Sequence, residues 1–227
     1  MTTSGTTTWN PGLGEIIEEA AERAGFELRS GYQLRTAVRT ANFLAAEWAS
    51  RGLNLWTIDT QTLNLTTGVN TYTLPADTID VIECEWRQNP GTINQLDVQI
   101  ERFSVSQYAQ ITNKLATGIP INYYVQRLAD APVIQFYFTP DQPYTVQYWR
   151  LRRMQDAGGV TNTIDVPFRF IPAFTAGLAF MLASKKIGAE QRALALKPLY
   201  DEAFQLAADE DRDRASVWFL PWTGDIY

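Results

Sequence analysis

The spacing of apolar residues changes from a helical to a strand-like period within the stretch Asn42–Ile58. Over Gln33–Arg51 apolar residues recur every three or four positions, which predicts a helix with one core-facing stripe. From Leu55 to about Thr161 apolar and polar residues mostly alternate, as they do in half-buried strands. The helical stripe consists of Leu34, Ala37, Val38, Ala41, Leu44, Ala45 and Trp48.

Three further helices are expected on either side of this strand-rich region. Glu15–Ala24 places glutamates opposite an apolar face. Phe168–Lys186 is apolar on nearly all sides, which predicts a central helix, with Asp165 as a candidate cap before it. The last helix is Ala189–Ala208, and Pro198 is expected to kink it or to mark its true start. Its expected buried face consists of Leu196, Leu199, Ala203 and Leu206.

Two positions indicate further contacts of these helices. Gly177, with small residues at 173 and 176, would let a second helix approach the central helix closely. Phe43 lies roughly opposite Leu34 on the helical wheel and therefore lies off the main stripe. This placement predicts either a second core contact within the bundle or a contact with another subunit.

Between the helices, short alternating segments are separated by turns rich in proline and glycine. This spacing is typical of a sandwich or a barrel-like β domain. A short helix is expected over Ser104–Asn113. The fold class is therefore α+β, with a bundle of three to four helices and an antiparallel β-sandwich or barrel-like domain. Its later candidate strands are Leu96–Ile100, Ile121–Arg127, Val133–Thr139 and Tyr144–Leu151.

The composition of the 227 residues excludes several functional classes. Histidine is absent, which removes Ser-His-Asp and Cys-His catalysis and histidine-ligated zinc or iron. A single cysteine, Cys84, excludes an internal disulfide and fits folding in a reducing cytoplasm. No run approaches about 18 uninterrupted apolar residues, so no membrane span is expected. Residues 1–12 lack the charged and apolar regions of a signal peptide.

The charge pattern argues against tight nucleic-acid binding. The net charge is −6, whereas a protein that holds DNA firmly needs a basic surface to displace counterions. The one dense basic cluster, Arg150, Arg152 and Arg153, has two interpretations. It contacts DNA phosphates, or it is a solvated strand end or pairs with acids of a neighbouring subunit.

Two acidic clusters are candidate metal sites. Glu15, Glu18 and Glu22 share one helix face. Asp209, Asp211 and Asp213 alternate with other residues, but this run lacks the glycine and the distal glutamate of a calcium loop. The interleaved arginines favour a solvated or intersubunit charge network. We therefore predict no metal site, no cofactor and no catalytic residue.

Several segments together resemble the phage head-to-tail adaptor proteins, also called tail tubular protein A-like, of short-tailed phages. The resemblance covers about Ala37 to Ser216 and depends on the order and spacing of packing patterns. It implies a discontinuous helical bundle, residues 1–55 and 164–216, with an inserted β domain, residues 56–163. The segments are AAEWASRGLNLWTI, YTLPADTIDVIE, NKLATGIPINYYVQR, IQFYFTPDQPYTVQYW, DVPFRF, LAFMLA and LYDEAFQLAADEDRDRAS.

The resemblance also implies the function and the partners. Family members are structural virion proteins that form a ring of twelve subunits below the portal and join it to the tail nozzle. They line the channel through which double-stranded DNA passes, and that passage requires no sequence-specific binding. The implied location is the head-tail interface of the virion, after assembly in the host cytoplasm, with no membrane contact.

The C-terminal tail, residues 217–227, falls outside the family pattern and is the main candidate for partner binding. Aromatic anchors dominate the binding energy of many interfaces. The tail is predicted either to enter a pocket of the portal or to fold back on its own bundle or a neighbouring protomer. Its candidate contact residues are Trp218, Phe219, Leu220, Trp222, Ile226 and Tyr227.

A second functional hypothesis is a virion module that binds a glycan or a receptor through an aromatic-rich β domain. Aromatic residues make up 12% of the chain, enough to supply such a platform. An enzyme is not expected. A pair of carboxylates can hydrolyse a sugar, but the sequence singles out no such pair.

Overall fold

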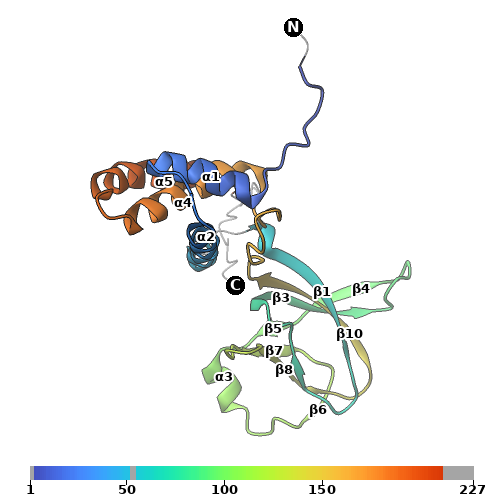
Figure 1. Ribbon diagram of the computed structural model, residues 1–227. Coiled ribbons are helices and arrows are strands. Elements are labelled where there is room, and N and C mark those ends of the chain that lie inside the picture. Colours follow the sequence, from blue (N-terminus) through green and yellow to red (C-terminus); the bar gives the residue numbers. More distant parts are fainter. Residues whose placement is uncertain (1–2, 52–54, 212–227) are drawn as a thin grey trace, which may run out of the picture.

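The computed structural model describes residues 3–51 and 55–211 of the protein (Figure 1). The helices gather in one body and the strands in another, which confirms the predicted α+β class. The helical body contains α1 (Leu13–Ala24), α2 (Gly31–Arg51), α4 (Ile171–Lys185) and α5 (Glu190–Glu210). A 3-10 turn, η1 (Leu55–Thr57), leads into the strands, and a second one, η2 (Phe168–Phe170), leads into α4.

Helix α4 lies at the centre of the helical body, as its apolar sequence predicts. It packs against α1, α2 and α5 and buries residues on every side. Gly177 lies where three helices meet, because a Cβ atom there would come within 2.7 Å of Tyr200 on α5 and 3.1 Å of Leu44 on α2. Trp48 of α2 lies in the same core and donates a 2.8 Å hydrogen bond to the Tyr200 hydroxyl.

The predicted buried face of α5 is wrong by part of a turn. Leu196 is buried, but Leu199 and Leu206 are 58% and 66% exposed. The orientation of the helix is decided by Tyr200 and Phe204, which are buried in place of the two leucines. Burying two aromatic rings removes more apolar area from water than burying two leucines. Pro198 lies inside the helix, so it does not mark the helix start. The buried set is Ala193, Leu196, Tyr200, Phe204, Ala207 and Ala208.

The helix starts also differ from the predictions. The helices α1 and α2 begin two residues earlier than expected, at Leu13 and Gly31. Asp165 does not cap the central helix. Its carboxylate accepts hydrogen bonds from Arg152 and from the backbone N–H of Gln155 instead.

The strands form two four-stranded sheets, which confirms a sandwich-like arrangement without barrel closure. One sheet has the order β1-β10-β3-β4 and the other has the order β2-β8-β7-β5. Most pairs are antiparallel as expected, but β5 pairs with β7 in parallel, and so does β6 with β9 in a small separate sheet. The strands are β1 (Ile58–Leu65), β2 (Thr71–Thr73), β3 (Thr78–Gln88), β4 (Leu96–Gln99), β5 (Glu101–Arg102), β6 (Thr117–Gly118), β7 (Asn122–Gln126), β8 (Val133–Tyr137), β9 (Thr139–Pro140) and β10 (Tyr144–Arg152).

A separate apolar core lies between the two sheets. It includes Cys84 and the aromatic rings of Tyr123, Phe136 and Tyr148, because alternate residues of each strand point inward. Burial raises the pKa of the Cys84 thiol well above its usual value. The short helix α3 (Val105–Gln110) forms where the sequence predicts it, with a capping box between Ser104 and the third helical residue.

Two chain passages connect the helical body to the strands, and hydrogen bonds fix them to each other and to the helices. Asn42 on α2 accepts a 2.8 Å hydrogen bond from the backbone N–H of Ala157 on the return passage. Trp56 donates a 3.1 Å hydrogen bond to the carbonyl of Asp165 and packs on Phe170 with ring centroids 4.7 Å apart. The return passage is also fixed to the start of α1, whose first two N–H groups donate to the carbonyls of residues 160 and 162.

Among the helices that the structure describes, none combines the length and apolar character needed to span a bilayer.

Candidate interaction surfaces

The aromatic tail predicted to bind a partner, Trp218 to Tyr227, lies outside the described residues. Its role therefore stays a prediction. The second predicted contact residue, Phe43, lies on α2 within the described part of the chain.

Phe43 belongs to an exposed stripe along α2, here called the Phe43 face. Its side chain is 59% exposed, and Tyr32 on the same stripe is 71% exposed. Arg35 and Arg39 lie between them at intervals of three and four residues, which places all four side chains on one side of the helix. Lys185 at the end of α4 adjoins this stripe, with its Nζ atom 5.9 Å from the centre of the Phe43 ring.

The Phe43 face carries positive charge that no acid of the described chain neutralises. In the regions that the structure describes, Arg35, Arg39, Lys185 and Lys186 take part in no ion pair, although the chain as a whole is acidic. Partial burial lowers the pKa of Lys185, and the nearby Arg39 lowers this pKa further. Lys185 donates a 2.6 Å hydrogen bond to the Thr40 hydroxyl, which holds its ammonium group beside Phe43.

Neither interpretation of the basic cluster, a DNA contact or a solvated strand end that pairs with a neighbour, fits Arg150, because this side chain is almost completely buried. Its guanidinium donates to both Asp59 and Asp77, at 2.7 and 2.6 Å for the shortest bonds, and to the Thr78 hydroxyl. Hydrogen bonding to this guanidinium lowers the pKa of Asp77. The acids that pair with Arg150 thus come from its own β domain and not from a neighbour.

The other two members of this basic cluster have separate surroundings. Arg152 is bound to Asp165 on the passage that leads back to the helices. Arg153 is exposed, and its backbone N–H donates to the carbonyl of Asp77. The cluster is therefore mainly a structural charge network at the end of β10. Sequence spacing could not reveal this, because the acids come from positions far away in the chain.

The acidic clusters do not assemble into a metal site in the described parts of the molecule. Glu15, Glu18 and Glu22 are all exposed on α1. Asp211 departs from the expected solvated run, since it is buried and forms an ion pair with Arg169 of η2. This pair fixes the end of α5 against the start of α4.

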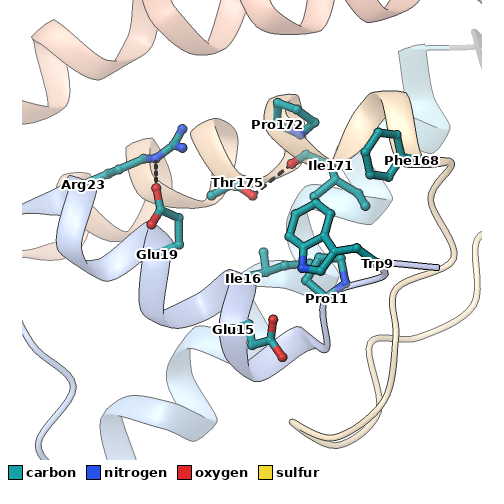
Figure 2. Close-up of a pocket in the computed structure, with 10 residues that line it drawn as sticks. All are labelled: Trp9, Pro11, Glu15, Ile16, Glu19, Arg23, Phe168, Ile171, Pro172 and Thr175. Carbon is teal, nitrogen blue, oxygen red and sulfur yellow. Dashed lines mark hydrogen bonds and ion pairs between the residues drawn. The ribbon is translucent and has the colours of Figure 1, made fainter. Parts of the chain in front are cut away.

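An apolar cleft of about 460 Å³ lies between α1 and the start of α4 (Figure 2). Trp9 of the N-terminal arm and Phe168 of η2 form its apolar mouth, with ring centroids 5.8 Å apart in an edge-to-face arrangement. Both rings are largely exposed, at 63% and 66%. The other lining residues are Pro11, Glu15, Ile16, Glu19, Arg23, Ile171, Pro172 and Thr175.

Exposed aromatic side chains are confined to the helical body and the N-terminal arm within the described residues. They are Trp9, Tyr32, Phe43 and Phe168. The large apolar side chains that the β domain exposes most are all aliphatic, and its aromatic rings within the described residues are buried or only partly exposed. These aliphatic residues are Val69, Ile82, Ile93, Leu96, Val105, Leu115, Ile119, Ile121 and Leu128.

The sequence reasoning singled out Phe43 but missed its neighbours. The signal that could have found them is the spacing of Tyr32, Arg35, Arg39 and Phe43, which forms a second stripe beside the core-facing one. The cleft had no comparable signal, because Trp9 and Phe168 are far apart in sequence and meet only after α1 and α4 pack together.

The model of the SU10 adaptor protein family matches residues 12–223, nearly the whole chain. The match includes residues 217–223, so the expectation that the whole tail falls outside the family pattern is wrong for this part of it. This match confirms the predicted assignment to a phage head-to-tail adaptor family. It supports a structural role in the virion, in contact with other virion components such as portal and tail. A search of curated proteins gave no significant match. On its sequence and fold, the chain belongs to the SU10 adaptor protein family.

Proposed function

We propose that this adaptor is one subunit of a ring that joins the portal to the tail nozzle. The helical body, residues 1–55 and 164–216, makes the contacts between subunits. The β domain, residues 56–163, extends from the ring as a separate body. The resemblance to tail tubular protein A-like adaptors suggests twelve copies.

The observation that carries this proposal is the composition of the Phe43 face. It joins exposed aromatic rings, Tyr32 and Phe43, with arginines that have no acidic partner in the described chain. Tyrosine, phenylalanine and arginine are enriched at protein interfaces, and tryptophan, tyrosine and arginine are the usual energetic hot spots. A surface of this kind fits a contact that becomes buried on assembly.

A ring built from identical subunits needs two different contact surfaces on each copy, because successive subunits join head to tail. The Phe43 face supplies one of them. Its unpaired cations call for an acidic surface on the next copy, and the exposed glutamates of α1, Glu15, Glu18 and Glu22, offer such a surface. Complementary charges of this kind set the register of an interface and speed association.

The net charge of −6 supports a DNA channel that does not grip its cargo. Each phosphate contact would add to the affinity for DNA and slow the passage of the duplex. The sequence has one dense arginine cluster, and two of its members, Arg150 and Arg152, form ion pairs with acids of this chain. Double-stranded DNA thus passes through the lumen without sequence-specific binding.

The aromatic tail, Trp218 to Tyr227, is proposed to anchor the ring to the portal. Its two tryptophans, a phenylalanine and a tyrosine are suited to fill apolar pockets on a partner. A protein that lacks the tail should fold normally and fail to bind the portal. Normal portal binding by this truncated protein would rule out the anchor.

The test of the ring is the mass of the assembly formed with the portal protein. Phe43→Ala should weaken assembly by about 2 kcal/mol per contact, roughly 30-fold in affinity, if this residue is an interface anchor. The stability of the isolated subunit should change by less than about 0.5 kcal/mol, because the side chain is exposed. Both values follow from native mass spectrometry of the mixture and urea unfolding of the subunit.

Leu128→Ala is a matched control, because it removes an apolar side chain of similar exposure, 49%, from the β domain. This control should leave assembly with the portal unchanged. Unimpaired ring formation by Phe43→Ala would contradict the proposal, and so would an equal loss of subunit stability. Tryptophan fluorescence that responds to added sugars would favour the glycan-binding alternative.

A further inference from the structure

The C-terminal end of α5 lies against η2, the 3-10 turn that contributes one ring to the apolar cleft. Asp211, the last described residue, is ion-paired with Arg169. Arg169 directly follows Phe168, one of the two aromatic rings that form the mouth of the cleft. The chain that follows Asp211 therefore starts beside the 3-10 turn that contributes Phe168 to the cleft.

The sequence beyond Asp211 has the composition that the cleft calls for. Residues 217–222 read VWFLPW, a run of six apolar residues with three aromatic rings. The run is preceded by Arg212, Asp213 and Arg214, while the rim of the cleft carries Glu15 and a Glu19 that is ion-paired with Arg23. Apolar residues thus match the apolar interior, and the rim offers Glu15 as an acid for the arginines that precede the run.

The length of the connecting segment also fits. Six residues separate Asp211 from Trp218, and an extended chain advances roughly 3.3–3.6 Å per residue. This span of roughly 20 Å lets the run reach a cleft whose lining includes Phe168, the neighbour of Arg169 in sequence. Because the connection is short, the effective concentration of the run at the cleft is of the order of millimolar, which favours its own chain over a second copy.

We infer that residues 217–222 of the free subunit occupy the cleft between α1 and α4 of their own chain. The segment covers the exposed rings of Trp9 and Phe168, which would otherwise leave an aromatic pair in water. This contact concerns the isolated subunit and does not depend on ring formation. It makes the segment unavailable to a partner until that partner competes for it.

Disulfide trapping in the full-length protein tests this inference. The native Cys84 is buried, and burial raises the pKa of its thiol, so it gives little background reaction. The test protein carries Glu15→Cys in the cleft and Ser216→Cys just before the aromatic run. In the control protein Glu27→Cys replaces Glu15→Cys, because Glu27 follows the opposite end of α1. A disulfide requires Cα atoms about 4.4–6.8 Å apart, so only a docked segment reacts quickly.

Under mild oxidation of the isolated subunit, the Glu15→Cys pair should form an intrachain disulfide at least about tenfold faster than the Glu27→Cys pair. Adding Phe168→Ala or Trp218→Ala to the test protein should return its rate to that of the control. Equal rates for the two pairs would overturn the inference, and a disulfide between two chains would overturn the assignment to the same chain. Since no portal is present, these outcomes are independent of the proposed ring.

Discussion

Replacing Gly177 with alanine tests the packing at the centre of the helical body. The added Cβ atom would lie 2.7 and 3.0 Å from two carbons of the Tyr200 ring and 3.1 Å from Leu44. Ordinary carbon contacts are about 3.5–4.0 Å, so three atoms must move. The ring of Tyr200 has little freedom to do so, because it is buried and its hydroxyl accepts a hydrogen bond from Trp48.

The expected size of the effect follows from two opposing contributions. Overpacking of a core destabilises proteins by about 1–3 kcal/mol, and the rigid ring places this site in the upper half of that range. Alanine in place of glycine inside a helix regains about 1 kcal/mol. The net loss in the free energy of unfolding should be about 1–2 kcal/mol, which lowers the melting temperature by roughly 2–8 °C.

Urea unfolding followed by tryptophan fluorescence and by circular dichroism measures this loss. Gly31→Ala is the control, because its Cβ atom meets nothing closer than 3.9 Å, and this residue also lies in a helix. The control should be neutral or slightly more stable than the natural protein. A Gly177→Ala protein as stable as the control would refute the close three-helix contact.

Three further predictions concern the β domain and the passages to it. Arg150→Met should destabilise the protein by about 1–3 kcal/mol in urea unfolding, because Asp59 and Asp77 lose a charged hydrogen-bond donor but are 33% and 46% exposed, so water partly solvates their charges. Folding lowers the pKa of Asp77, so its contribution to the free energy of unfolding is complete above about pH 5 and is lost as the pH falls through the lowered pKa. Arg150→Met should make the free energy of unfolding, measured from about pH 6 to 2, fall less steeply with acid than in the natural protein. Asn42→Ala should cost about 1–3 kcal/mol and speed amide exchange at Ala157, whose N–H loses its acceptor; unchanged exchange would contradict this role.

Local periodicity was sufficient to predict most of the fold. The stripe from Leu34 to Trp48 lies on the buried side of α2, and the alternation over Tyr144–Leu151 corresponds to β10. Both elements have one clear apolar side, so packing and sequence pattern agree. Helix α5 has two apolar stripes, and the packing around Gly177 decided between them by placing Tyr200 there.

Long-range ion pairs and the interaction surfaces were harder to predict. Arg150 meets Asp59 and Asp77 only because three chain segments are brought together at one end of the first sheet. The prediction that Asp165 caps a helix was wrong for the same reason, a long-range ion pair, because its carboxylate binds Arg152 instead. Phe43 was identified because its position on a helical wheel needs only local geometry, and the tail residues stay a prediction.

The two bonded passages between the helices and the strands have a mechanical consequence. A body attached by one chain segment can swivel freely about it. Here the Trp56–Asp165 bond joins the two segments and the Asn42–Ala157 bond fixes the return segment to α2, so rotation about one segment alone would break these hydrogen bonds. Bending about a single axis is then the easiest remaining motion of the β domain, and a pulling force on it is shared by both segments.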